Sequence, residues 1–189
     1  MIRIAHRINS SEALNLIPTD CGIELDLRSI NSELVLGHDF PAQGEEFSHF
    51  LDSYNHKLMI LNVKEDGLEE LIIKILSARE GIEYFFLDQP VPTMLKSSKA
   101  GYFTSFRVSE FEGLPILPTG AKWIWIDSFT GDWSHVEPAL EYAQRNNMRT
   151  CLVAPELQGR FNQDETNWLI SEFKERLDAV CTKNLPTWE

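Results

Sequence analysis

Cysteine is scarce in this sequence, which has three in 189 residues: Cys21, Cys151 and Cys181. They are too far apart for the paired spacing of a zinc motif, and their odd number argues against the disulfide framework of a small secreted protein. A long hydrophobic run is also lacking, both as a membrane span and as the apolar segment of a signal peptide. We therefore expect a soluble, cytoplasmic protein with no membrane insertion.

Positively charged residues are also scarce. The sequence has 17 Lys and Arg against 29 Asp and Glu, which gives a formal net charge of −12. Nucleic-acid binding needs a basic surface, and anionic membranes attract one, so the composition disfavours both partners. A phosphorylated ligand would have to be held by local positive charge or by a metal ion. The sequence leaves the oligomeric state open.

The chain also lacks low-complexity linkers and sharp changes of composition, so we predict a single domain over residues 1–189. Short apolar or alternating runs recur along it and alternate with helix-like segments. The predicted strands cover residues 3–7, 23–28, 34–40, 58–64, 84–88, 102–107, 122–127 and 150–156, and the predicted helices cover residues 44–54, 66–80, 91–100, 136–147 and 164–180.

This alternation predicts an α/β fold in which βαβ crossovers build a parallel sheet. The run at 34–40 follows its predecessor after a short polar turn and is expected to form a hairpin. Seven main strands remain, in a chain shorter than the usual ~250 residues of a barrel, which predicts a small and incomplete TIM-barrel-like fold. A doubly wound open sheet is the alternative.

Ionisable or amide side chains stand at the ends of nearly all the main strands. In barrel enzymes the working groups lie at the C-terminal strand ends, so the pattern predicts one shared anion or metal site. Glu24 and Asp26 form the clearest pair, because alternate residues of a strand point to the same face, about 6–7 Å apart. The alternative is that they are the wet face of a surface strand. The strand-end groups are His6, Arg7, Glu24, Asp26, Asn62, Lys64, Asp88, Arg107, Asp127 and Glu156.

Three short motifs follow one another within the first 40 residues: His6-Arg7, then Glu24-Leu25-Asp26, then Gly37-His38-Asp39. This ordered set resembles the HR…ExD…HD signature of the glycerophosphodiester phosphodiesterases, in the phospholipase-C-like phosphodiesterase superfamily of TIM barrels. Further on, LNVK at 61–64 sits where that family has an ExK strand. The later stretches FFLDQPVP, SFRVSEFE and VAPELQGR look like a short branch of the same superfamily.

The resemblance implies a role for each matching residue. Glu24 and Asp26 match metal-binding carboxylates and Asn62 takes the place of a third, so the implied cofactor is a divalent cation, Mg²⁺ or Ca²⁺. His6 and His38 match the acid–base histidines, whose ordinary pKa near 6.5 suits both tasks. Arg7 and Lys64 match groups that hold the phosphate, and its strand-end position suggests Arg107 as a further phosphate contact. A surrounding set of supporting side chains is expected to comprise Asp88, Glu110, Asp127, Glu156 and Arg160.

The implied function is that of a metal-dependent phosphodiesterase acting on a glycerophosphodiester or a similar small phosphoryl ester, by hydrolysis or by intramolecular cyclisation. Two departures from the family pattern support a second hypothesis. Asn62 supplies one negative charge fewer, and Ile8 replaces the glycine that usually follows the HR pair. The second hypothesis is a barrel that binds a phosphorylated ligand without turnover. A third is a sugar-phosphate isomerase or aldolase that uses Lys64 to form a Schiff base.

Overall fold

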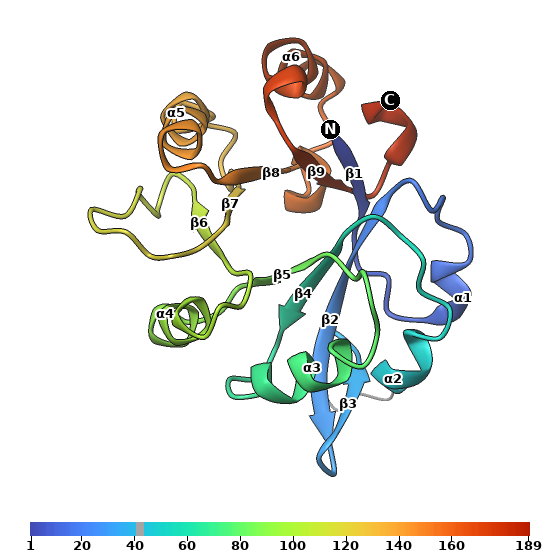
Figure 1. The fold of residues 1–189 in the computed structure, drawn as a ribbon. Helices are drawn as coiled ribbons and strands as arrows, with labels where there is room; N and C mark the ends of the chain where they lie inside the picture. The colour runs from blue at the N-terminus through green and yellow to red at the C-terminus, as the bar shows by residue number, and fades with distance from the viewer. Residues whose placement is uncertain (41–43) are drawn as a thin grey trace.

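The computed structural model describes residues 1–40 and 44–189, and Figure 1 shows strands arranged around a central axis with helices outside them. The strands form one sheet in the order β5-β4-β2-β1-β9-β8-β7-β6, and neighbours along this path run parallel. Their bounds are β1 (Ile2–Ala5), β2 (Gly22–Ile30), β4 (Met59–Val63), β5 (Tyr84–Leu87), β6 (Ser105–Val108), β7 (Trp123–Ile126), β8 (Arg149–Val153) and β9 (Ala179–Thr182). The prediction of a TIM-barrel-like α/β fold is confirmed.

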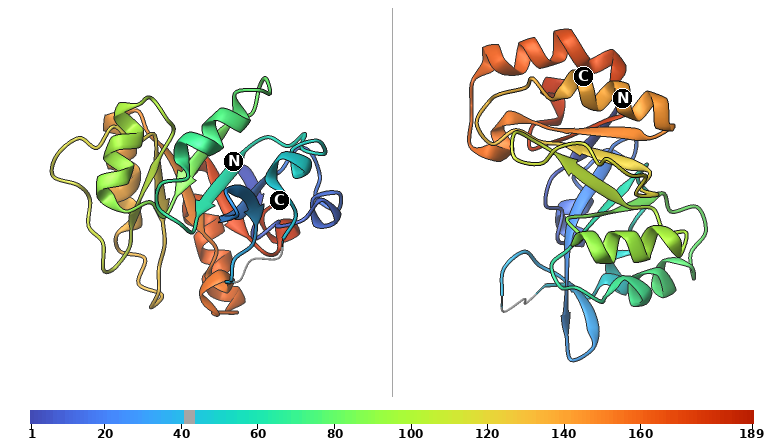
Figure 2. Two further views of the ribbon diagram at one scale, coloured as in Figure 1. Left: turned by 90° about the horizontal axis from the view of Figure 1, so that it is seen from below. Right: turned by 90° about the vertical axis from the view of Figure 1, so that its left-hand side faces the viewer.

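The prediction of a hairpin strand at 34–40 is also confirmed. Strand β3 (Glu33–Leu36) turns back along the second half of β2 in antiparallel register, with Leu27 opposite Leu36. Figures 1 and 2 show this hairpin projecting beyond the rest of the barrel. The hairpin leads into Gly37 and His38. The Gly37 amide donates to the carbonyl of Asp26, and the His38 ring contacts Arg7, so both residues lie at the barrel mouth.

The barrel has one parallel strand more than the seven predicted. Strand β9 pairs with β1 on one side and with β8 on the other, and so fills the expected gap. Its first residues fall inside the helix predicted at 164–180, but helix α6 (Gln163–Phe173) ends earlier. The four-residue run Ala179–Thr182 is too short to be told from a helix turn by periodicity, which explains the difference.

The barrel closes at a seam between β5 and β6, where the pairing is minimal. An isolated parallel bridge joins Phe86 to Thr104. The amide of Phe86 donates to the carbonyl of Phe103 at 2.9 Å, and the Ser105 hydroxyl donates to the carbonyl of Phe86 at 2.9 Å. Other strand neighbours share longer register, so the seam is the weakest part of the wall.

Six α-helices lie in the described ranges, and the two views of Figure 2 show them outside the strands. The segment predicted as a helix at 44–54 forms only one turn of helix, at α2. The helices are α1 (Ser11–Leu14), α2 (Phe47–Phe50), α3 (Glu69–Leu76), α4 (Val91–Lys99), α5 (Val136–Asn146) and α6. No helix in the described chain is long and apolar enough to cross a membrane.

The barrel interior is apolar below its C-terminal end. Phe85 and Trp123 stack with ring centroids 4.6 Å apart, and both are buried. Trp125, Cys151 and other interior side chains belong to the same core cluster. This layer fills the centre of the barrel, and the working groups of such barrels lie above it, at the C-terminal strand ends.

Candidate active site at the barrel mouth

Glu24 and Asp26 project from β2 into the barrel mouth, and they are 1% and 0% exposed. Leu25 and Leu27 alternate with them and point outward into the core cluster beneath the helices. The idea of a wet strand face is therefore wrong, because the carboxylates face inward. Burying two neighbouring carboxylates is costly unless hydrogen bonds, cations or protons compensate them.

Glu24 receives two direct hydrogen bonds. The backbone amide of Arg7 donates to Oε2 at 2.8 Å, and the side-chain amide of Asn62 donates to Oε1 at 3.0 Å. Arg7 adopts a left-handed backbone with φ of 57°, a strained turn for a non-glycine residue that aims its amide at the carboxylate. Burial, reinforced by the charge of Asp26, raises the pKa of Glu24 to about 7.

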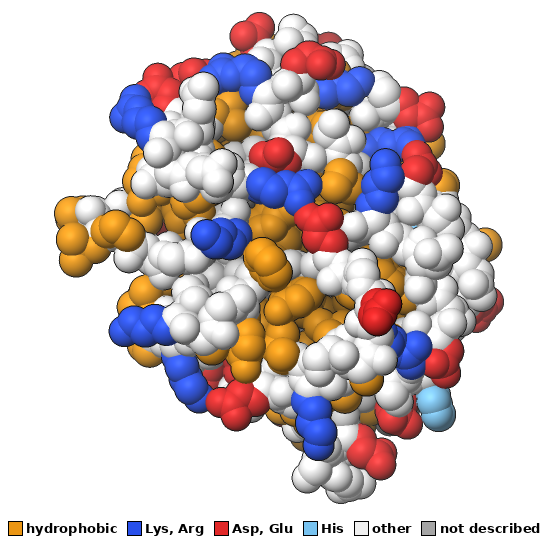
Figure 3. All heavy atoms as spheres, viewed as in Figure 1, with side chains coloured by type: hydrophobic (Ala, Val, Ile, Leu, Met, Phe, Trp, Pro, Cys, Tyr) orange, Lys and Arg blue, Asp and Glu red, His pale blue; other side chains and the backbone are white. Residues whose placement is uncertain are grey.

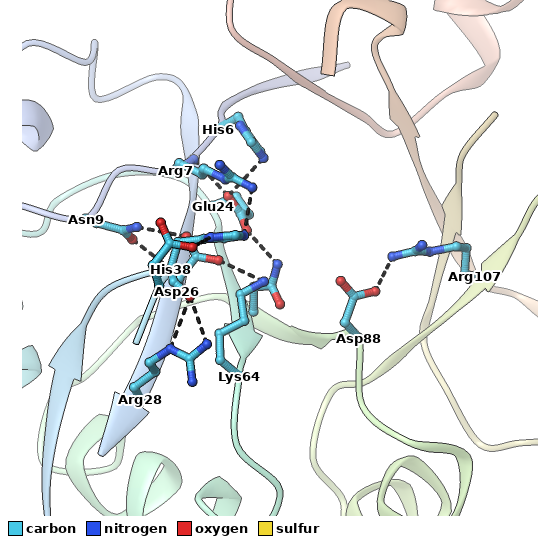
Figure 4. A network of polar contacts seen from close by, with 12 residues as sticks. His6, Arg7, Asn9, Glu24, Asp26, Arg28, His38, Lys64, Asp88 and Arg107 are labelled. Carbon is cyan, nitrogen blue, oxygen red and sulfur yellow. Dashed lines mark hydrogen bonds and ion pairs between the residues drawn. The ribbon is translucent and has the colours of Figure 1, made fainter. Parts of the chain in front are cut away.

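Asp26 is compensated differently. Asn9 makes a two-point contact, since its side-chain amide donates to Oδ2 and its Oδ1 accepts from the Asp26 backbone amide, each at 2.8 Å. The ammonium of Lys64 lies 3.0 Å from Oδ1. Figure 4 shows Asn9, Asp26 and Lys64 converging with Glu24 on one side of the mouth. Sequence reasoning did not single out Asn9, because an asparagine on a loop carries no strand-end signal.

The two predicted histidines lie at the same mouth. Nε2 of His6 is 3.8 Å from Oε2 of Glu24. Nε2 of His38 is 2.8 Å from Nη2 of Arg7, and Nδ1 of His38 is 2.8 Å from Asp39. Because a guanidinium can only donate, these contacts assign the proton of neutral His38 to Nδ1.

His6 is neutral at pH 7. Its pKa is lowered to about 4, chiefly by burial and next by the positive charges of Arg7 and Lys183. Its Nδ1 is buried and has no hydrogen-bond partner among the described residues. A neutral imidazole beside a carboxylate can accept a proton, which is the state a general base requires.

Lys183 is a second residue, after Asn9, that sequence reasoning missed. It directly follows β9, the strand that was not predicted. Its charge acts on His6, which directly follows the neighbouring strand β1. Within the described ranges, no carboxylate lies within ion-pair distance of the Lys183 ammonium. Lys183 thus adds to the positive charge that Arg7 and Lys64 place near His6. Recognising Ala179–Thr182 as a strand would have placed Lys183 among the strand-end groups.

The oxygen atoms of this cluster fit a hard divalent cation. Asn62 Oδ1 is buried and accepts no hydrogen bond in the described structure. Asp26 Oδ1 is also buried, and its partner among the described residues is the Lys64 ammonium at 3.0 Å. Asp26 and Asn62 are register partners on the adjacent strands β2 and β4, so the two side chains lie at the same level of the barrel. Among the described residues, no group of three or more His, Cys, Asp and Glu side chains is placed to hold a metal. The donor set is therefore two carboxylates and an amide.

Arg107 and Asp88 form a second cluster across the mouth (Figure 4). The Arg107 guanidinium donates to Asp88, and it lies 3.8 Å from Asp127 and 3.9 Å from Glu112. Gln158 donates to both carboxylate oxygens of Asp127 at 3.0 and 3.1 Å. Burial raises the pKa of Asp127, although the charge of Arg107 opposes this. Arg107 is thus surrounded by carboxylates, unlike Arg7 and Lys183.

The other expected supporting residues hold loops in place. Glu110 accepts four hydrogen bonds from residues 128–130, which outweigh its burial and lower its pKa. Glu156 accepts from the Thr182 hydroxyl and from the Lys183 amide, fixing the turn after β9. Arg160 donates to Glu165 and lies over the Trp133 ring. The structure therefore brings Glu156 close to the mouth cluster and gives Glu110 and Arg160 loop contacts.

Comparison with solved structures finds this fold in glycerophosphodiester phosphodiesterases. The enzyme from Agrobacterium tumefaciens gives a TM-score of 0.74 at 10% identity, covering 100% of this chain and 98% of that chain. The one from Parabacteroides distasonis gives 0.67 at 12% identity, with 99% and 94% covered. The one from Thermotoga maritima gives 0.62 at 14% identity, with 98% and 95% covered.

No protein-family model matches the sequence, and no curated protein matches it either. The likeness to the solved structures extends over nearly the whole of each chain, which confirms the fold that the motif resemblance implies. At identities of 10–14% it establishes a shared fold. The chemistry has to be argued from the side chains at the mouth.

Proposed function

We propose that this chain is a phosphodiesterase of the glycerophosphodiester phosphodiesterase type, acting on a small phosphodiester with a divalent cation. The observation that carries the proposal is the convergence of a buried carboxylate pair, two histidines and three cations at the mouth of the shared fold. Each of these groups has a task in phosphodiester cleavage, and the apolar layer of the barrel interior lies beneath them.

Local cations offset the overall negative charge at the phosphate. Arg7 and Lys183 are free of carboxylate partners among the described residues, and their charges meet around His6. The planar guanidinium of Arg7 suits two phosphate oxygens, while Lys183 supplies a point charge. Lys64 is ion-paired with Asp26 and therefore reaches the phosphate from the carboxylate side.

The histidines divide the proton transfers. His6 is neutral and removes the proton from the attacking group, which is either water or a neighbouring hydroxyl of the substrate. His38 protonates the departing alkoxide. Its Nε2 faces Arg7 in the free protein, and when Arg7 turns to the phosphate this nitrogen can carry a proton while Asp39 stabilises the charged ring.

Glu24, Asp26 and the carbonyl of Asn62 would hold the cation, with Lys64 giving up part of its contact with Asp26. A bound divalent ion neutralises charge that builds up on the phosphate oxygens in the transition state. Binding requires Glu24 to be ionised and the Asn62 amide to turn its oxygen inward, since its nitrogen faces Glu24 in the free protein.

A non-catalytic binding barrel is the second candidate. It is favoured by the Asn62–Glu24 hydrogen bond together with the raised pKa of Glu24, because a protonated, hydrogen-bonded pair is stable without a cation. This candidate predicts that phosphate esters bind at Arg7 and Lys183 and are not cleaved.

The experiment is an assay of glycerophosphodiesters and of bis-(p-nitrophenyl) phosphate with Mg²⁺, Ca²⁺ or Mn²⁺. Metal-dependent turnover that is lost in His6→Ala and in Glu24→Ala supports the phosphodiesterase. Turnover that survives both substitutions comes from elsewhere and contradicts the proposal. A phosphate ester that stabilises the fold without being cleaved under any of the three metals favours the binding barrel.

A further inference from the structure

A cavity with a volume of about 610 Å³ lies at the seam between β5 and β6. Its walls come from the ends of these two strands, the start of α4 and the loop between β6 and β7. The apolar part of its lining consists of Leu87, Val91, Met94, Phe106 and Pro115. The site described above does not use this space, although it opens beside the mouth.

The seam explains why a cavity exists here. The two strands are joined by one bridge at Phe86 and Thr104, and past that bridge the wall has no ladder. Leu87 follows the bridge on one strand and Phe106 follows it on the other, and both residues line the cavity. A group that enters the mouth can therefore pass sideways into the wall.

The cavity adjoins the carboxylate cluster. Asp26 pairs in register with Asn62, and Asn62 pairs in register with Leu87. Adjacent strands are about 4.8 Å apart, so Leu87 lies two strand spacings, about 10 Å, from Asp26 at the same level of the barrel. A phosphodiester held over Glu24 and Asp26 would thus have one of its alcohol groups within reach of the cavity.

The charges at the cavity edge do not favour a second anionic group. Arg107 is the one cation of the lining, and two carboxylates, Asp88 and Glu112, contact it. The edge is thus net negative by one charge. Of the polar neighbours, Ser105 donates to the Phe86 carbonyl, and the amide nitrogen of Gln89 donates to Glu69 and Ser97. Gln89 Oε1 and Arg107 Nε are buried without a hydrogen-bond partner among the described residues.

The outer wall continues into exposed apolar residues. Ile116 and Leu117, which follow Pro115, are 99% and 76% exposed, and Phe111 in the same loop is 74% exposed. Figure 3 shows hydrophobic side chains at the tip of the loop that projects away from the barrel between β6 and β7 (Figure 1). An apolar chain that leaves the cavity would find further contacts along this loop.

We infer that the seam cavity is a subsite for an uncharged alkyl or acyl chain carried by one alcohol of the phosphodiester. The inference rests on the proposed function for the position of the phosphate. The substrate class is then phosphodiesters that carry an apolar chain. The phosphate would lie at Arg7 and Lys183, and the apolar chain would lie against Leu87 and Met94.

Binding of n-alkyl phosphates tests this without any need for turnover. The probes are methyl, butyl and hexyl phosphate, measured by titration calorimetry below the concentration at which they aggregate. Each methylene that enters an apolar site contributes about 0.8 kcal/mol, so the Kd should fall about threefold to fourfold per added methylene. Equal Kd values for methyl and hexyl phosphate would overturn the inference.

Two variants locate the chain. Met94→Trp fills the cavity from a buried position, and Val91→Trp narrows it from a side chain that is 65% exposed and so does not endanger folding. Both should flatten the dependence on chain length while leaving methyl phosphate binding unchanged. Leu16→Trp, at an 80% exposed position in the turn after α1, is the matched control and should keep the full dependence. A dependence that persists in both cavity variants places the chain elsewhere and refutes the subsite.

The two proposals fail separately. Tight hexyl phosphate binding that Val91→Trp abolishes, in a protein that cleaves no phosphodiester, supports the subsite and contradicts the phosphodiesterase. Cleavage of glycerophosphodiesters with no preference for a longer chain contradicts the subsite alone. Vesicles of zwitterionic lipid test whether the chain-bearing substrate is taken from a membrane. If the protein binds hexyl phosphate but not vesicles, the substrate is one dissolved in water. If Met94→Trp and Val91→Trp still bind vesicles, the membrane contact does not use the cavity, which counts against the subsite.

Discussion

The side-chain amide of Asn62 donates a 3.0 Å hydrogen bond to Oε1 of Glu24. This contact directs the amide nitrogen into the place where a cation would need an oxygen, and it leaves Oδ1 of Asn62 buried without a partner. The central functional question, whether the mouth binds a cation strongly, is therefore decided by one amide.

Asn62→Glu should convert the cluster into a three-carboxylate site. Metal affinity rises with the number of charged ligands, so we expect Mn²⁺ to bind at least about tenfold more tightly than to the wild type. Without metal the variant should be less stable at pH 8, because three neighbouring carboxylates are then buried. Titration calorimetry measures the first effect and urea unfolding in EDTA the second. Asn62→Gln is the control, and an Mn²⁺ affinity no higher than that of this control would contradict the assignment.

Glu24→Gln should change how stability depends on pH in metal-free buffer. The pKa of Glu24 in the folded state is about 7, above its ordinary 4.5, so the folded protein holds this proton more tightly than the unfolded chain. Stability is consequently lost as the pH rises from about 4.5 through 7. The neutral Gln avoids this loss, and the variant should be more stable than the wild type at pH 8 by on the order of 3 kcal/mol.

The measurement for Glu24→Gln is urea unfolding at pH 5 and pH 8. His6 acts in the opposite direction, because its folded pKa of about 4 lies below its ordinary 6.5 and stability falls as the pH drops through that range. The stability of Glu24→Gln should therefore still fall at acid pH, as that of the wild type does, but should no longer fall as the pH rises from 5 to 8. Glu141→Gln, an exposed control on α5, should behave as the wild type, and equal pH 8 stabilities for Glu24→Gln and wild type would refute the raised pKa.

Lys183→Gln should weaken phosphate binding and also alter His6. A charge-assisted contact contributes about 1.5–3 kcal/mol, so the KM for a phosphodiester should rise about tenfold or more. Removal of the positive charge should raise the pKa of His6, which a merely structural role would not do. NMR titration of the His6 ring reports the second effect. Lys122→Gln, just before β7 at the opposite end of the barrel, should change neither quantity.

Trp188→Ala should destabilise the whole barrel. Trp188 lies in the last turn of the chain, is 1% exposed, and packs into the core cluster with α6 and β9 residues. Replacing such a side chain costs about 3–5 kcal/mol in the free energy of unfolding. Trp168→Ala, at a 45% exposed position on α6, should cost less than 1 kcal/mol. Similar losses for the two variants in urea unfolding would show that Trp188 does not stabilise this core cluster as its burial indicates.

Much of the mouth could be predicted because its parts are local in sequence. His6-Arg7, Glu24-Asp26 and Gly37-His38 stand on one strand end, one strand and one hairpin, and each motif is readable without long-range information. The sequence could not predict that Glu24 and Asp26 point into the barrel, because alternation alone does not tell which face of a strand meets the core.

The features that were missed depend on contacts between distant segments. Strand β9 forms from four residues that only its neighbours β1 and β8 stabilise, and Lys183 was missed with it. The position of Arg107 at a strand end was anticipated, but its carboxylate partners come from two other strand ends, at Asp88 and Asp127, and from the loop at Glu112. The seam between β5 and β6 arises from how the barrel closes, which no local pattern encodes.

The most direct test of the central claim is ³¹P NMR of a glycerophosphodiester incubated with the wild-type protein, with Mg²⁺ and then with excess EDTA. We expect the diester signal to be replaced by that of a phosphomonoester, or of a cyclic diester if a substrate hydroxyl attacks, with Mg²⁺ only, and we expect no change with His6→Ala. A diester signal that persists unchanged with Mg²⁺, Ca²⁺ and Mn²⁺ would contradict the phosphodiesterase assignment.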